Sequence, residues 1–268
     1  MIEGQDGLNW ERWRAIARVA EDVGFVGLYR SDHFTNPSGG YKDSLECWTS
    51  LAWLASHTSR LEFGPLVSPV SFRHPSMLVR VAAALDDLSG GRLHLGIGAG
   101  WQEREHTNYG YYLGSVSERI ARLRESAQII THLLRSAEPL TFPGKYFNLR
   151  EAVLLPRPKR ATPLVIGGNG RQLTLPLAAR FADEWNASFR TAEQFSELNA
   201  HLDTLLDREG RARSAVRRTL MTRLRYGSRD EVREQVAALE AVGVQRLMLG
   251  WPELDDLDGI AALGAWLC

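Results

Sequence analysis

Short apolar runs alternate with amphipathic helical patterns from one end of the chain to the other. In the first helical pattern Gly24 stands where a helix usually ends, after apolar residues at helical spacing: Trp13, Ile16, Ala17, Ala20 and Val23. The apolar run at 25–29 then predicts a buried strand. The same order recurs, with predicted strands at 25–29, 61–64, 93–97, 164–166, 184–186, 219–224 and 246–249 and a stub at 2–3.

The segments between these strands carry helical patterns with recognisable ends. Pro75 opens one helix, as proline does in a first turn, and a Gly-Gly pair ends it. Thr191 and Ser228 each stand three residues before Gln or Glu, which is the pattern of a capping box. Residues 136–160 are rich in proline and are predicted as an irregular excursion. Further helices are expected at 44–57, 117–135, 191–206 and 228–242, and one more after residue 170.

This alternation determines the fold class. Repeated βα units connect through right-handed crossovers and give a parallel sheet. Eight such units close into a barrel, whereas fewer form an open doubly wound sheet. No linker, repeat or low-complexity segment interrupts the chain. We therefore expect one α/β domain, residues 1–268, folded as a (β/α)8 TIM barrel whose weak seam lies at the short first strand.

Composition narrows the class of protein without naming a ligand. Hydrophobic residues make up 44% and charged residues 24%, which is ordinary for a globular core. The formal net charge is zero, so neither nucleic acid nor an anionic membrane is expected as a partner. Cys47 and Cys268 have no metal-ligand spacing, and no metal site is expected. The sequence shows no signal-peptide pattern or membrane-spanning run, and we expect a cytoplasmic protein.

Barrel enzymes carry their active sites on the loops that follow the carboxyl ends of the strands. In this chain these are 31–34, 65–68, 98–101 and 167–170, together with Asn186. The glycine-rich turn at 167–170 precedes a helix, where backbone N–H groups approach a phosphate closely. A glycine turn without a ligand is the alternative. The dinucleotide fingerprint fails at 96–101, because Trp101 stands where its last glycine should be.

His33 follows Asp32 directly after a predicted strand. A histidine exchanges a proton near neutral pH, which suits general acid–base work or a hydrogen bond to a redox ring. Neighbours at a strand end point to opposite sides. We therefore expect Asp32 to stabilise the loop and His33 to face the ligand. The alternative is a histidine that only satisfies loop backbone groups.

Two tryptophans and two further histidines lie near predicted strand ends or within a strand. Trp101 and Trp185 would line the binding site of an aromatic ligand if they face the barrel mouth. His106 lies close to the Trp101 loop and is the second candidate for proton transfer. His94 lies within a strand and is expected to be structural.

At these residues the chain resembles the bacterial luciferase-like superfamily, in particular its branch that uses the deazaflavin coenzyme F-420 (F420). The resemblance covers nearly the whole chain and rests on 20–25, 31–34, 69–75, 85–93, 96–101, 166–170 and 182–186. Its most specific part is Ser-Gly-Gly-Arg-Leu followed by Gly-x-Gly-x-Gly-Trp. Such proteins begin with a full first strand and are longer between the seventh strand and the last helix. The resemblance thus implies a barrel shortened in both places.

The resemblance implies an oxidoreductase that transfers a hydride between coenzyme F420 and a small organic substrate. A non-prolyl cis peptide bond between Leu66 and Val67 would back the ring. The implied catalytic residues are His33, Asp32 and Trp101. The implied cofactor-binding residues are Leu66, Val67, Gly98, Ala99, Gly100, Gly167, Gly168, Asn169, Gly170 and Asn186. Some sugar-phosphate dehydrogenases of this branch have a catalytic Glu in place of Trp101, so their substrate is not carried over.

Two other functions fit the same pattern. An FMN-dependent monooxygenase uses reduced flavin and oxygen on the same scaffold, and a non-catalytic flavin-binding protein fits a shortened barrel. A homodimer is also expected, because the helix at 44–57 carries more apolar surface than one barrel-facing stripe needs.

Overall fold

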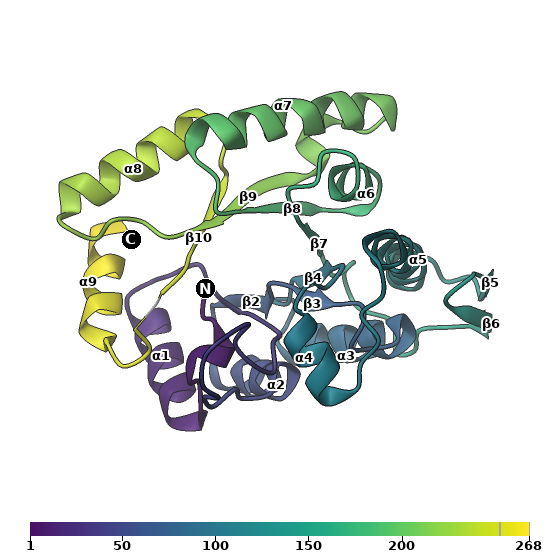
Figure 1. The fold of residues 1–268 in the computed structure, drawn as a ribbon, viewed down its shortest axis with the longest axis horizontal. Helices are drawn as coiled ribbons and strands as arrows, with labels where there is room; N and C mark the ends of the chain where they lie inside the picture. Colours follow the sequence, from purple (N-terminus) through teal and green to yellow (C-terminus); the bar gives the residue numbers. More distant parts are fainter. Residues whose placement is uncertain (252, 268) are drawn as a thin grey trace.

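The computed structural model describes residues 1–251 and 253–267 and shows a ring of strands surrounded by helices (Figure 1). The ring contains β1 (Gly27–Arg30), β2 (Glu62–Pro65), β3 (Ser68–Pro69), β4 (Leu95–Gly98), β7 (Leu164–Gly167), β8 (Glu184–Ser188), β9 (Arg217–Thr222) and β10 (Arg246–Leu249). β1 pairs with β2, and β3, β4, β7, β8, β9 and β10 pair in that order, always in parallel. A bridge between Phe63 and Leu93 joins the two sets. The predicted TIM barrel is confirmed.

A single residue of the amino-terminal stub closes the ring. Ile2 forms parallel bridges with Arg30 on one side and Trp251 on the other. The Ile2 N–H donates to the Tyr29 carbonyl at 2.9 Å, and the Trp251 N–H donates to the Met1 carbonyl at 3.0 Å. The first strand is therefore as short as predicted, and the seam of the barrel lies between β1 and β10.

Helices connect the strands and cover the outside of the ring (Figure 1). They are α1 (Trp10–Asp22), α2 (Cys47–His57), α3 (Pro75–Leu88), α4 (Glu103–Tyr109), α5 (Val116–Arg135), α6 (Thr174–Phe181), α7 (Ala192–Arg208), α8 (Arg229–Ala241) and α9 (Leu257–Leu267). The capping box predicted at Thr191 is present, while Ser228 caps the Glu231 amide. Within the described ranges no helix combines the length and apolar character that a membrane crossing needs.

The barrel interior has an apolar layer and a charged layer. The apolar layer contains Tyr29, Leu66, Val165, Met221 and Met248, with Met1 and Val67 packed against it. In the charged layer, His94 lies 3.3 Å from a Glu62 oxygen and 3.5 Å from a Glu184 oxygen. Arg246 contacts Glu62 and donates to the Tyr29 hydroxyl at 2.8 Å. His94 thus lies inside the barrel between carboxylates of β2 and β8, which supports the expectation that it is structural.

One expectation about secondary structure is wrong. Residues 136–160 are not irregular, because β5 (Leu140–Pro143) and β6 (Asn148–Ala152) form an antiparallel hairpin. Glu125 of α5 organises its turn by accepting the amides of Lys145, Tyr146 and Phe147. Helix α9 was not predicted, since glycines interrupt its pattern. Gly264 is needed there, as an added Cβ would lie 2.4 Å from Val23.

The apolar surface of α2 is packed within the chain rather than displayed. Leu51 and Leu54 are fully buried, and Trp48 is nearly so. Trp53 contacts Trp10 edge to face, with ring centroids 6.3 Å apart. The excess of apolar residues expected to form a dimer interface therefore covers the barrel and α1.

Candidate active site

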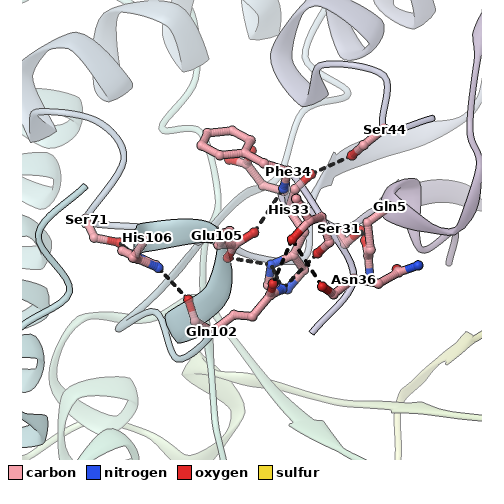
Figure 2. A network of polar contacts seen from close by, with 12 residues as sticks. Gln5, Ser31, His33, Phe34, Asn36, Ser44, Ser71, Gln102, Glu105 and His106 are labelled. Atoms are coloured by element: carbon pink, nitrogen blue, oxygen red, sulfur yellow. Dashed lines mark hydrogen bonds and ion pairs between the residues drawn. The ribbon is translucent and has the colours of Figure 1, made fainter. Parts of the chain in front are cut away.

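His33 and Glu105 form a buried pair at the mouth of the barrel (Figure 2). The His33 Nδ1 lies 2.8 Å from Oε1 of Glu105, which is fully buried. The second oxygen of Glu105 accepts the Phe34 N–H at 2.9 Å. Within the described residues, Nε2 of His33 has no hydrogen-bond partner, and 16% of the side chain is exposed. The carboxylate thus occupies one ring nitrogen and leaves the other free.

The surroundings of His33 favour its protonated form. Burial alone would lower the pKa of His33, but the hydrogen bond and the charge of Glu105 outweigh burial and raise this pKa above its ordinary value. The imidazolium therefore persists to a higher pH than in an exposed histidine. The pair can hold a proton at Nε2 near neutral pH.

Asp32 is engaged by Ser68 and Arg73 rather than by His33. It is 2% exposed and accepts hydrogen bonds from Ser68 Oγ and from Arg73 Nη1, each at 2.5 Å. Arg73 also contacts Glu46 at 2.8 Å. These contacts tie the loop after β1 to β3, as expected for a loop-stabilising residue.

Residues at and near α4 complete the polar network. Gln102 donates to the Thr35 carbonyl at 3.0 Å, which holds the loop after β1 against α4. The two ring nitrogens of His106 contact the Gln102 carbonyl and Ser71 Oγ, both at 2.7 Å (Figure 2). Both nitrogens are engaged and the ring is buried, so His106 has no free ring nitrogen for proton exchange in this structure.

The two tryptophans lie in different places. Trp101 is 58% exposed and meets His33 edge to face, with ring centroids 5.6 Å apart. Trp185 is fully buried, stacks on Phe195 and donates to the Gly168 carbonyl. The expectation that Trp185 walls the ligand is wrong, since its side chain points from the strand toward α7. Trp101 alone stands beside His33.

Val67 protrudes against glycines of the neighbouring strands. The Leu66–Val67 peptide bond is cis, as expected. A Cβ added to Gly98 would lie 2.5 Å from Val67 Cγ2, and one added to Gly167 would lie 3.1 Å from Cγ1. Any side chain at these two positions would collide with Val67 or displace it. The glycines therefore allow Val67 its place at the carboxyl ends of β4 and β7.

The loop after β4 continues this surface. Gly100 has φ +79, and an added Cβ would lie 3.1 Å from Ser71 Oγ. Ala99 packs against the core and is partly buried. The three residues Gly98, Ala99 and Gly100 thus form a strand end with little side-chain bulk, next to Trp101.

The glycine turn after β7 uses some of its amides internally. The Gly168 N–H donates to the Asn186 carbonyl at 3.0 Å, and the Gly170 N–H donates to Thr174 Oγ1 at 2.9 Å. In the described part of the chain, the amides of Asn169 and Arg171 have no acceptor. An anion bound at this turn would therefore contact those two amides and the exposed Arg171 side chain. The amides of Gly168 and Gly170, which the sequence also predicted to face a phosphate, are already engaged.

Asn186 faces the barrel interior from β8 and is buried. Its Nδ2 donates to Thr219 Oγ1 at 2.8 Å. The side chain of Asn169 links the same strand end to the glycine turn, because it donates to the Ser188 carbonyl and accepts the Ser188 amide, both at 3.0 Å. Asn169 and Asn186 thus fix the geometry of the turn.

The sequence did not single out Glu105, Gln102 or Arg73. The sequence did contain a pattern that could have identified Glu105 and Gln102 as site residues. Gln102 and Glu105 are three residues apart directly after a strand end, which places them on one face of a short helix. Arg73 lacked such a signal, because it meets Asp32 only through the folding of separate loops.

The chain belongs to the luciferase-like monooxygenase family, whose model matches residues 2–247. It is 32% identical over 216 residues to an F420-dependent glucose-6-phosphate dehydrogenase of Kineococcus radiotolerans, covering 79% of this chain and 63% of that protein. It is 26% identical over 211 residues to the pyrimidine monooxygenase RutA of Caulobacter segnis, covering 76% of this chain and 59% of that protein. The chain spans less than two thirds of these relatives.

A solved structure shares the fold over its full length. An F420-dependent secondary alcohol dehydrogenase in complex with an F420-acetone adduct superposes with a TM-score of 0.87 at 18% identity, covering 100% of this chain and 98% of that one. This likeness confirms the barrel architecture.

Proposed function

We propose that this protein is an oxidoreductase that transfers a hydride between coenzyme F420 and a small organic substrate. The observation that carries the proposal is the His33–Glu105 pair, which leaves Nε2 free at the mouth of a luciferase-like barrel. When bound, the deazaflavin accepts or supplies the hydride at its C5. The proposal draws further support from the F420-dependent relative.

The residues present fit such a cofactor. Val67 can lie at the strand ends, where we propose that the ring binds, because Gly98 and Gly167 lack side chains and a Cβ at either would meet Val67. The turn after β7 offers unengaged amides and Arg171 to a phosphate. We assign ring contact to Leu66, Val67, Gly98, Ala99 and Gly100, and phosphate contact to the turn that contains Gly167, Gly168, Asn169 and Gly170, with Asn186 supporting it.

In this proposal His33 moves the proton that accompanies the hydride. Glu105 holds the Nδ1 proton, so that only Nε2 can exchange a proton with a substrate oxygen. In oxidation of an alcohol, Nε2 takes the hydroxyl proton as the hydride leaves carbon, and in reduction of a carbonyl it returns that proton. Trp101 covers one side of His33 and helps to exclude water. Asp32 keeps the loop in place through Arg73 and Ser68.

The second candidate function is an FMN-dependent monooxygenase, which the similarity to RutA favours. A 5-deazaflavin does not form the flavin peroxide that monooxygenation uses, so oxygen dependence separates the two. A non-catalytic flavin-binding protein would bind cofactor without turnover. We also propose that the substrate is a small molecule and that the protein is a homodimer located in the cytoplasm.

Turnover with and without oxygen tests the proposal. Purified protein is incubated anaerobically with F420 and a panel of secondary alcohols and sugar phosphates, and cofactor reduction is followed by absorbance. A parallel aerobic assay uses reduced FMN and follows oxygen uptake against a protein-free control. Substrate-dependent reduction of F420 without oxygen supports the proposal. Substrate-dependent oxygen uptake with reduced FMN, together with no substrate-dependent reduction of F420, would contradict it.

A further inference from the structure

Gln102 is a buried polar residue whose side chain turns away from its own helix. It stands at the N-cap position of α4, is 2% exposed and forms no side-chain hydrogen bond with the helix. A side chain at this position ordinarily accepts a free amide of the first turn. The Gln102 side chain extends instead toward the loop after β1, which carries His33 (Figure 2). It therefore serves that loop rather than the helix that it precedes.

The Thr35 carbonyl fixes the orientation of the Gln102 amide. A carbonyl oxygen only accepts hydrogen bonds, so the atom 3.0 Å from it must be the amide nitrogen Nε2. The Thr35 hydroxyl, 3.2 Å from Oε1, can donate or accept and would fit either orientation. Nε2 also lies 3.3 Å from Nδ1 of His33. The Thr35 carbonyl thus takes one amide proton, and the second is available to the imidazole ring.

Nδ1 of His33 consequently lies between a donor and an acceptor. Oε1 of Glu105, at 2.8 Å, favours a protonated Nδ1, whereas the Gln102 N–H, at 3.3 Å, favours an unprotonated one. The carboxylate is charged and closer, so it keeps the proton on Nδ1. The second N–H of Gln102 then faces another N–H and is left without an acceptor, which costs free energy. This cost is largest for the imidazolium, because the positive end of the amide dipole faces a positive ring.

We propose that Gln102 is a positioning residue that opposes Glu105, so that His33 releases the proton at Nε2 more readily than the carboxylate alone would permit. The charged groups that face His33 are Glu105 on α4, Glu3 on the amino-terminal stub and Asp32 in the loop after β1. All three are carboxylates and favour the imidazolium, whereas the Gln102 amide acts in the opposite direction.

The consequence for turnover rests on the proposed function, in which Nε2 of His33 takes a proton from the substrate and later returns it. A ring that carboxylates hold permanently as imidazolium cannot take that proton. A ring whose two protonation states are both accessible near neutral pH can act in both directions of the reaction. Gln102 would thereby extend alcohol oxidation to lower pH.

Two substitutions separate this role from anchoring of the loop. Gln102→Met removes the amide at similar side-chain length, and the control Thr35→Val removes the hydroxyl but keeps the carbonyl that orients Nε2. In ring-nitrogen NMR titrations, His33 should bind its proton roughly threefold to tenfold more tightly in Gln102→Met. Its titration should be unchanged in Thr35→Val. The pH at which anaerobic alcohol oxidation with F420 is half-maximal should rise by the same factor in proton concentration.

An unchanged or weakened proton affinity of His33 in Gln102→Met would overturn the proposal. An equal rise in Thr35→Val would overturn it as well, because both changes would then act by loosening the loop. The unmodified protein gives a measurement that needs no variant, since the Gln102 Nε2 proton resonances should shift with the midpoint of His33. Constant resonances through that titration would also count against the proposal.

The NMR measurements do not depend on turnover, so they test the role of Gln102 even if F420 is not the cofactor. The expected titrations without any F420 reduction would contradict the proposed function and leave this inference standing. F420 reduction with an unaltered His33 titration in Gln102→Met would do the reverse.

Discussion

Replacing Glu105 with Gln removes a buried charge while keeping the shape of the side chain. The amide oxygen can still accept the Phe34 N–H, so the change falls on the contact with His33 Nδ1. Both side chains are largely shielded from water, and the lost charge-assisted hydrogen bond is worth about 1.5–3 kcal/mol. If this bond reaches its full strength only in the transition state, when the imidazolium forms, kcat falls roughly 10- to 100-fold.

The pH dependence gives a second, independent readout. Glu105 raises the pKa of His33, so the pair contributes its full stability below the ordinary histidine pKa and loses it as pH rises through the raised value. Glu105→Gln should therefore lower the His33 pKa and destabilise the fold more at pH 6 than at pH 9. Ring-nitrogen NMR titration and urea unfolding at the two pH values measure these effects.

Glu103→Gln is the matched control, since Glu103 is an exposed carboxylate on the same helix. It should leave the His33 titration, the stability difference between the two pH values and turnover unchanged. An unaltered His33 titration in Glu105→Gln would refute the reasoning. So would an equal loss of stability at both pH values, because that would mean the carboxylate acts only through packing.

Three further substitutions test separate parts of the site. His33→Asn should lower kcat roughly 10²- to 10⁴-fold while the melting temperature and F420 affinity stay close to wild type; an unchanged kcat would make the histidine structural. Gly98→Val should displace Val67 and weaken cofactor binding in fluorescence titrations, whereas Gly40→Val, with open space around it, should not. Arg171→Glu should weaken FMN binding roughly threefold to tenfold but leave riboflavin, which lacks the phosphate, unaffected; equal loss for both would place the phosphate elsewhere.

The barrel was predictable because its strands are buried apolar runs, and because glycine, proline and capping residues mark the ends of the helices between them. The run that contains β10 matches its predicted bounds, and the capping box at Thr191 fixed the start of α7. The β5–β6 hairpin was not predictable, because its turn depends on Glu125, which is distant in sequence. Helix α9 escaped detection, since Gly264 weakens helix propensity and is tolerated only through contact with α1 and the turn after it.

The candidate site was predictable in its strand-end residues but not in its partners. His33, Val67 and Trp101 could be placed because each follows a strand in a parallel barrel. Glu105 could not be paired with His33, because the two residues lie 72 positions apart and only the closed barrel brings them together. The direction of Trp185 depended on which face of β8 packs against α7, and a one-residue shift reverses it.

Parallel titration of the purified protein with F420 and with FMN tests the central claim most directly. Both ligands are followed by fluorescence at the same ionic strength, with Gly98→Val as the site-blocked control. The account predicts tighter binding of F420 than of FMN, and weakening of both by the control substitution. Equal or reversed affinities, or binding that the Gly98→Val substitution leaves untouched, would contradict it.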